Sequence, residues 1–167
     1  MKRTIAAAVA ALAGAEGWYA TEERLLGFRA AMAGAGILPD PELIRYSDWQ
    51  IRGGESAAEE LLSRPDPPTA IFGFNDNVAI GALNVARRLG LRVPEDVSLV
   101  GFDDTFQSRI VWPQLTTVRQ PLQELGRTGV SLLMRLLEGQ RVEALRMELS
   151  TTLVVRASTA PPRDAAS

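Results

Sequence analysis

The chain has 167 residues, 46% of them hydrophobic and 23% charged, which is typical of one globular domain and not of a disordered segment. The net charge is −2, so the composition gives no basic surface of the kind that binds nucleic acid. Cys and His are both absent, which removes the usual donors of zinc and iron–sulfur sites and excludes a Ser-His-Asp triad. We therefore expect no metal, no cofactor and no enzymatic activity.

The first residues, MKRTIAAAVAALAGAEG, fit two alternatives. A basic start, a run of apolar or small residues and an Ala-x-Ala-like end are the outline of a secretory signal peptide. The same residues fit a buried β-strand from Thr4 to Leu12. These residues alone leave both alternatives open. No other run approaches the ~20 apolar residues that a membrane span needs.

Helices and strands then alternate along the chain. The segment TEERLLGFRAAMAGAG predicts a helix that starts with Thr21 as its N-cap and ends at Gly34 to Gly36. After it we expect a strand at 43–46, a helix at 55–63, a strand at 70–74, a helix at 76–89 and a strand at 98–102. This alternation predicts an α/β fold with a Rossmann-like, doubly wound parallel sheet and right-handed crossovers.

The last third of the chain has a different pattern. Residues 115–118 predict a short strand, and residues 121–138 predict a helix with a broad stripe of leucines on one face. Residues 147–155 alternate between apolar and polar side chains, which predicts a half-buried strand. The segment 158–167 is polar and contains prolines, so we expect a disordered tail there.

Polar and aromatic side chains follow the predicted strands at their carboxyl ends, where doubly wound sheets bind ligands. Asn75, Asp103 and Trp49 each come after a strand, and Arg24 lies on the first helix. An Asn amide both donates and accepts, a carboxylate accepts two hydroxyl protons, and Arg presents a planar fork of donors. A Trp ring offers a flat apolar face to a sugar or a base. Together these groups predict a site for a neutral, hydroxyl-rich ligand such as a sugar or nucleoside.

Each of these residues also has an ordinary structural explanation. Asn75 or its neighbour Asp76 fits the N-cap of the next helix, and Asp103 fits a turn. Arg24 fits a solvated helix surface, and Trp49 fits the core. The expected site therefore depends on the fold bringing these side chains to one edge of the sheet.

A small hydrolase is a further alternative, because several carboxylates lie near that edge. An acid–base pair needs two carboxyl groups at a defined separation, and nothing in the sequence fixes one. The carboxylates available for such a pair are Asp76, Asp103, Asp104 and Glu124.

Three strings carry a family resemblance: PTAIFGFNDNVAIGALNVARRLGLRVPEDVSLVGFDD, PQLTTVRQPLQELGRTGVSLLMRLLEG and LVVRAST. In this order they resemble the effector-binding region of the lactose-repressor (LacI/GalR) transcription regulators, and RLLGFRAAM is similar too. The resemblance covers roughly Ala11 to Thr159. It implies a sensor and not an enzyme, in which a helix-turn-helix headpiece precedes two similar α/β lobes that hold the ligand between them.

The resemblance also implies a division of the chain. Residues 1–119 match the second effector-binding lobe, of the periplasmic-binding-protein-like type I. Residues 120–145 match a helix that in the family belongs to the first lobe, and residues 146–157 match the strand that returns to the second. The tail is then 158–167. The headpiece, the hinge and most of the first lobe have no counterpart in this sequence.

The ligand-contacting positions of the family fall on Arg24, Trp49, Asn75 and Asp103, and Trp18 matches a position that often lines the same cleft. A Trp at position 49 is similar to the sugar-responsive members, so the resemblance implies a small carbohydrate effector. It also implies a homodimer, with two candidate surfaces: the segment 106–112 and the helix that carries Ile80 and Leu83. DNA would be bound only through a headpiece that this chain lacks, and no membrane is involved.

Because family members are cytoplasmic, the resemblance favours the strand over the signal peptide. A secreted periplasmic sugar- or solute-binding protein of a transporter is the alternative, and the signal-like start favours it. The strings VPEDVSLVGFDD and LTTV favour the regulator.

Overall fold

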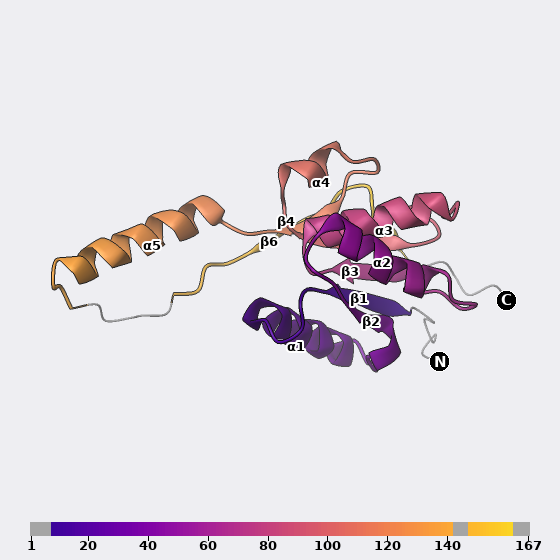
Figure 1. Cartoon of the computed structure of the whole chain (residues 1–167), viewed down its shortest axis with the longest axis horizontal. Helices are drawn as coiled ribbons and strands as arrows, with labels where there is room; N and C mark the ends of the chain where they lie inside the picture. The colour runs from indigo at the N-terminus through magenta and orange to yellow at the C-terminus, as the bar shows by residue number, and fades with distance from the viewer. Residues whose placement is uncertain (1–7, 142–146, 162–167) are drawn as a thin grey trace.

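In a computed structural model of the chain, residues 8–141 and 147–161 form a six-stranded sheet with helices on both faces (Figure 1). The strand order is β2-β1-β3-β4-β5-β6; the first five strands are parallel, and β6 pairs antiparallel with β5. The strands are β1 (Val9–Ala13), β2 (Ile44–Tyr46), β3 (Ala70–Gly73), β4 (Ser98–Asp103), β5 (Thr116–Arg119) and β6 (Thr152–Val154). The helices are α1 (Tyr19–Gly34), the short 3₁₀ helix η1 (Pro41–Leu43), α2 (Ile51–Leu62), α3 (Asp76–Arg88), α4 (Phe106–Ile110) and α5 (Leu122–Leu137).

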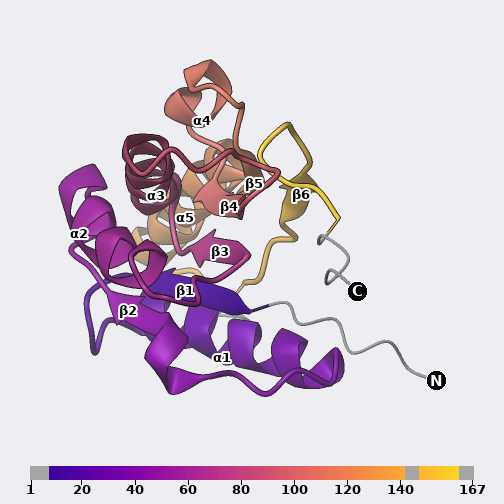
Figure 2. The same cartoon turned by 90° about the vertical axis from the view of Figure 1, so that its right-hand side faces the viewer.

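The two faces of the sheet are buried by different helices, as the period-two geometry of a strand requires. On β1, Ala10 and Leu12 point into a core formed with α2 and α3, whereas Ala11 and Ala13 point into a second core formed with α1. Figure 2 shows α1 on one side of the sheet and α2 with α3 on the other. The doubly wound α/β fold expected from the sequence is confirmed, with an antiparallel strand added at one edge.

The amino-terminal strand is an interior strand of this sheet, one place from the edge strand β2. β1 begins at Val9 and pairs with both β2 and β3, so from that residue on the apolar run that also fits a signal peptide forms a strand inside the sheet. The first part of the expected strand, residues 4–7, lies outside the described residues. Thr21 is not the N-cap of the following helix, because α1 starts earlier, at Tyr19. Thr21 is buried in its first turn and donates its hydroxyl to the carbonyl of Ala15 at 2.8 Å.

Helix α2 begins four residues before the expected start at residue 55, and Gly54 therefore lies within it. The reason is close packing against α3. A Cβ atom on Gly54 would lie 2.6 Å from the carbonyl oxygen of Val78, and one on Gly81 would lie 2.5 Å from that of Ile51. These glycines allow the two helix backbones to approach each other.

Replacing Gly81 by alanine is therefore expected to destabilise the lobe. The added methyl group meets backbone atoms that cannot rotate away, and overpacking of this kind costs typically ~1–3 kcal/mol. The matched control is Gly34→Ala at the end of α1, where an added Cβ has no atom within 4 Å. Urea unfolding of both variants measures the difference, and an equal stability of the two would contradict the packing described for Gly81.

The carboxyl-terminal part departs from the sequence prediction in two places. Of the strand expected at 147–155, only Thr152–Val154 forms a strand. Ser158 is not part of a disordered tail, because it is buried and its hydroxyl donates to the carbonyl of Leu99 at 2.6 Å while accepting from the amide of Thr116 at 2.8 Å. These two bonds tie the segment after β6 to β4 and β5.

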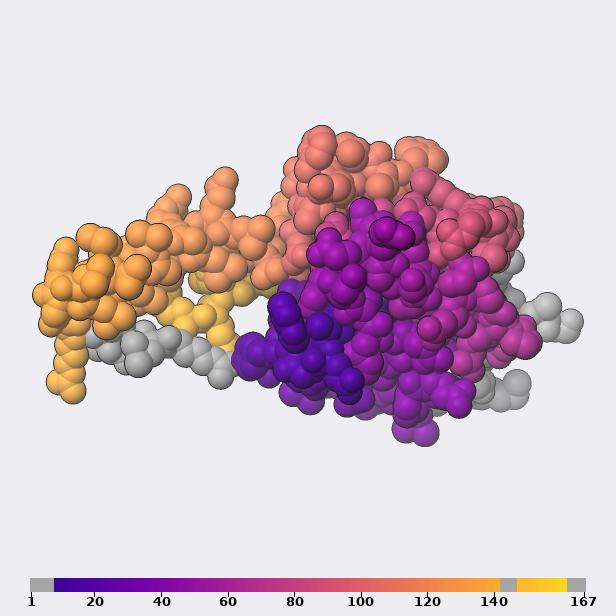
Figure 3. Space-filling model, in the orientation of Figure 1, coloured from indigo at the N-terminus to yellow at the C-terminus, as the bar shows by residue number. Residues whose placement is uncertain are grey.

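Helix α5 forms where the sequence predicts a helix, but none of its side chains is buried. It lies away from the sheet in Figure 1 and projects from the body of the molecule in Figure 3. Most of its large apolar side chains are exposed, namely Leu122, Leu125, Val130, Leu133, Met134, Leu136 and Leu137, and Leu132 is half-buried. Within residues 8–141 and 147–161, no helix has the length and apolar character needed to cross a membrane.

Candidate functional site

The carboxyl ends of the parallel strands bring four of the five expected site residues together. Arg24 reaches from α1 towards the end of β4, where its Nη2 lies 3.8 Å from Oδ1 of Asp103. Its Nη1 donates to the carbonyl of Phe74, and its guanidinium lies over the rings of Phe102 at 4.0 Å and Trp49 at 5.4 Å. Arg24 is therefore at the centre of this group. The solvated surface position considered as its alternative is wrong.

Asn75 joins the same group and is also the N-cap of α3. Its Oδ1 accepts from the amide of Val78 at 2.8 Å, and its Nδ2 donates to the carbonyl of Trp49 at 3.0 Å. Asn75 is therefore the N-cap of α3 and also one of the side chains at the carboxyl edge of the sheet, which we call the rim. An Asn amide has two donor hydrogens and two acceptor lone pairs, so one of each is left for a ligand.

Trp49 follows β2 and adopts a left-handed backbone, with φ = 67°. For a non-glycine residue this conformation costs about 1–3 kcal/mol, and it persists only where the surroundings hold it. The half-buried indole packs against the α1 core and lies directly over Gly14, where an added Cβ would be 1.9 Å from the ring. Its Nε1 is buried without a hydrogen-bond partner among the described residues. This donor is left unsatisfied in the packed structure, which is unusual for a buried polar group.

Asp103 lies at the end of β4 with its carboxylate partly exposed. Its Oδ1 accepts a hydrogen bond at 2.6 Å from Nε2 of Gln120, which lies in the short connection between β5 and α5. Burial raises the pKa of Asp103 above its ordinary value, and the hydrogen bond from Gln120 and the charge of Arg24 act in the opposite direction. Burial lowers the pKa of Arg24 below its ordinary value, and the negative charge of Asp103 acts in the opposite direction.

Trp18 is placed differently from the other four residues. It precedes α1, and 61% of its surface is exposed. The structure thus places it near the start of the helix that carries Arg24. Its indole is not part of the packed group around Arg24 and Asp103.

Sequence reasoning missed two residues of the rim, Gln120 and Phe102. Gln120 bonds to Asp103, and Phe102 lies against Arg24. The contact of Phe102 depends on the packing of α1 against the sheet, and that of Gln120 depends on the register of β5 against β4. No local sequence pattern shows either. Both residues line a hollow of about 940 Å³ between α1 and the sheet, whose other walls include Phe28, Phe72 and Val100.

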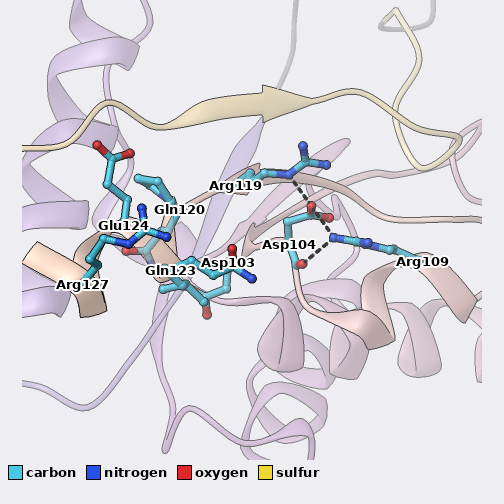
Figure 4. Close-up of a pocket in the computed structure, with 10 residues that line it drawn as sticks. Asp103, Asp104, Arg109, Arg119, Gln120, Gln123, Glu124 and Arg127 are labelled. Atoms are coloured by element: carbon cyan, nitrogen blue, oxygen red, sulfur yellow. Dashed lines mark hydrogen bonds and ion pairs between the residues drawn. The ribbon is translucent and has the colours of Figure 1, made fainter.

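A second hollow, of about 610 Å³, lies where β4 and β5 meet the start of α5 (Figure 4). Charged and amide side chains dominate it. The residues around it are Asp103, Asp104, Arg109, Arg119, Gln120, Pro121, Leu122, Gln123, Glu124 and Arg127. In Figure 4, Arg109 and Arg119 converge on Asp104 while Asp103 and Gln120 lie beside them.

The two buried carboxylates near the rim are fully engaged by the protein. Asp76 accepts from the amide of Thr105 at 2.7 Å, from its hydroxyl at 2.9 Å and from the hydroxyl of Thr117 at 2.5 Å. Asp104 pairs with arginines. Among the described residues, no group of three or more carboxylates is arranged to hold a metal ion. Neither Asp76 nor Asp104 is therefore free to act in an acid–base pair.

The pKa of Asp104 predicts a dependence of stability on pH. Burial raises it, but hydrogen bonds from Arg156, Arg119 and Arg109 outweigh this and lower the pKa from 3.8 to about 2. Between these values the unfolded chain binds a proton that the folded chain does not, so the stabilisation is complete above about pH 4 and is lost as the pH falls through about 2. Urea unfolding at a series of pH values below about 4 measures this effect. The free energy of unfolding should fall more steeply with falling pH in the wild type than in Asp104→Asn, and equal slopes would contradict the expectation.

This fold, with a polar and aromatic rim at the carboxyl ends of the strands, is of the periplasmic-binding-protein-like class. Residues 3–159 match the family described as the periplasmic binding protein-like domain. The HTH-type transcriptional repressor CytR of Escherichia coli is 38% identical over 151 residues, and the regulator CelR of Thermobifida fusca is 39% identical over 150. Each alignment covers 90% of this chain and 44% of the relative.

Solved structures of transcriptional regulators have the same fold as this chain. The complex of the transcriptional regulator CelR with cellobiose superposes with a TM-score of 0.86 at 40% identity, covering 90% of this chain and 46% of that one. A dimeric Lac repressor superposes with a TM-score of 0.87 at 34% identity, covering 94% and 57%. The chain belongs to the periplasmic binding protein-like domain family, and it spans about half the length of the transcriptional regulators that it matches. These relatives are regulators and not enzymes.

Proposed function

We propose that the chain is the second effector-binding lobe of a LacI-type transcriptional regulator and that its effector is a small carbohydrate. The observation that carries the proposal is the convergence of Arg24, Asn75 and Asp103 with the Trp49 ring at the carboxyl edge of the sheet. Arg24, Asn75 and Asp103 form hydrogen bonds to hydroxyl groups, and Trp49 stacks against the apolar face of the sugar. Trp18 lines the entrance.

In the proposed regulator this lobe works together with a first lobe and a DNA-binding headpiece. Residues 120–145 belong with a first lobe, residues 146–157 return to the second lobe, and the exposed apolar face of α5 packs against that first lobe. The effector shifts the balance between two arrangements of the lobes and so changes the affinity for DNA, which a separate headpiece binds. The protein acts in the cytoplasm and has no catalytic activity. The regulators found as relatives favour this function over that of a secreted periplasmic solute-binding protein.

Thermal melting tests the proposal. The purified chain is heated with cellobiose, with other sugars and with nucleosides, each added in excess. A ligand at about 100 times its Kd stabilises the folded state by ~2.7 kcal/mol, which raises the Tm measurably. We expect the shift for at least one sugar and its loss in Trp49→Ala, whereas Leu38→Ala, at an exposed position far from the rim, keeps it. No shift with any compound would contradict binding by this lobe.

A homodimer is part of the proposal, and α4 provides the surface for it. Phe106, Ile110 and Trp112 are exposed large apolar side chains close together in sequence, and Trp112 is 76% exposed. The other surface expected from the sequence is wrong, because Ile80 and Leu83 are buried in the core that α3 shares with α2.

Trp112→Asp is therefore expected to weaken self-association by roughly tenfold or more, because a charge replaces the most exposed of these apolar side chains. Leu38→Asp is the matched control, since Leu38 is 91% exposed and lies in the loop before η1. Sedimentation velocity over a range of concentrations compares the two variants with the wild type. A wild-type chain that stays monomeric at high concentration would contradict the proposed homodimer.

A further inference from the structure

The backbone at the end of β4 is left-handed at two successive residues that are not glycines. Asp103 has φ = 112° and Asp104 has φ = 53°. Such angles favour glycine, and other residues keep them only where the surrounding structure holds them in place. This turn decides the direction of the Asp103 side chain, so whatever holds the turn also positions that carboxylate.

Asp104 is held by three arginines from three different parts of the lobe. Its side chain is 1% exposed and receives Nη2 of Arg109 on α4 at 2.9 Å and Nε of Arg119 on β5 at 2.6 Å. Arg156, which follows β6, donates to its other oxygen. Figure 4 shows the first two contacts immediately beside Asp103. Three cations thus meet one buried carboxylate, and the contacts fix it from several directions.

The flanking groups complete the restraint. The amide of Asp104 lies 3.4 Å from the hydroxyl of Thr117, and the amide of Thr105 donates to Asp76 at 2.7 Å. Arg156 also donates to the carbonyl of Leu115 at 2.7 Å, which anchors the cluster to the start of β5. Among the described residues, the Asp103 carboxylate is contacted by Gln120 and, at a greater distance, by Arg24, and that side chain is 26% exposed.

We propose that Asp104 is a positioning residue for effector binding: its contacts with Arg109, Arg119 and Arg156 hold the left-handed turn that directs the Asp103 carboxylate into the rim beside Arg24. Asp104 does not touch the effector, because its buried oxygens are occupied by the arginines. The inference rests on the proposed function, since it requires Asp103 to bind the effector. It assigns to the arginine cluster a role in ligand affinity in addition to its role in stability.

A double-mutant cycle distinguishes this role from a purely structural one. The variants are Asp103→Asn, Asp104→Asn and the double variant, and the control is Asp96→Asn, which removes the surface ion pair with Arg92. Titration calorimetry measures the Kd for cellobiose, or for whichever sugar or nucleoside gives the largest shift in the melting screen. Circular dichroism checks that each variant is folded at the temperature used.

We expect Asp104→Asn to raise the Kd by roughly tenfold in the wild-type background and to have almost no effect in the Asp103→Asn background. Asp96→Asn leaves the Kd unchanged. If Asp104→Asn does not fold, Arg109→Gln removes one contact of the cluster at a half-exposed side chain. We then expect a smaller rise in the Kd, which is again absent in the Asp103→Asn background.

The outcomes separate the two proposals. If Asp103→Asn weakens binding but Asp104→Asn does not, or weakens it equally in both backgrounds, the positioning role is overturned and the proposed function stands. If the wild type binds none of the compounds, or if Asp103→Asn leaves binding unchanged, the assignment of Asp103 to the effector fails and the inference fails with it.

Discussion

Arg24→Ala weakens effector binding by roughly 10- to 100-fold and leaves the lobe folded. This expectation follows from the position of Arg24, whose guanidinium lies over Phe102 and Trp49 and next to Asp103. A hydrogen bond from a charged donor contributes ~1.5–3 kcal/mol, and the partly buried Asp103 carboxylate also loses its nearest cation. Titration calorimetry with the compound selected by melting measures the loss.

Two further variants show whether the geometry or only the charge of Arg24 matters. Arg24→Lys keeps the charge but loses the planar fork of donors, so we expect an affinity between those of the wild type and Arg24→Ala. Arg29→Ala removes an exposed arginine one turn further along α1 and should not change binding. An Arg24→Ala variant that binds as tightly as the wild type would remove Arg24 from the site.

The largest loss of stability is expected for Asp76→Ala. The carboxylate of Asp76 is completely buried and accepts three hydrogen bonds from Thr105 and Thr117, which link α3 to the start of α4 and to β5. Its removal leaves those donors buried without an acceptor, and the loss of such a network costs about 3–5 kcal/mol. That is a large part of the ~5–15 kcal/mol that stabilises an ordinary domain.

Urea unfolding of Asp76→Ala and Asp66→Ala tests this expectation. Asp66 is exposed in the loop before β3, so its removal should change stability by no more than about 0.5 kcal/mol. Asp76→Asn keeps the shape and one acceptor and should fall between the two. A loss below about 1 kcal/mol for Asp76→Ala would show that water or other groups replace the carboxylate easily.

The strands and helices of the lobe follow from the sequence because the local patterns are strong. β3, α3 and β4 lie within one or two residues of their expected ends, since an apolar run, an N-cap and an amphipathic stretch follow one another there. The start of α2 was missed because Gly53 and Gly54 normally end helices, whereas Gly54 is required here by contact with α3. Packing between elements overrides local propensity at that place.

The candidate site was partly predictable for a similar reason. Asn75 and Asp103 were expected together because parallel strands bring their carboxyl ends to one edge. Arg24 lies on a helix, and the family resemblance pointed to it. The arginines around Asp104 were not found, because Arg109, Arg119 and Arg156 are spread over about fifty residues and meet only through the pairing of β5 with β4 and β6. The left-handed backbone of Trp49 and Asp103 was also missed, since only the tertiary contacts hold it.

A crystal structure of the chain with the compound that raises the melting temperature most tests the central claim directly. The account predicts the compound at the carboxyl edge of the sheet, with hydroxyl groups within about 3 Å of Arg24, Asn75 and Asp103 and its flat face on Trp49. Density for the compound at any other place, with this edge unoccupied, would contradict the assignment of the effector site.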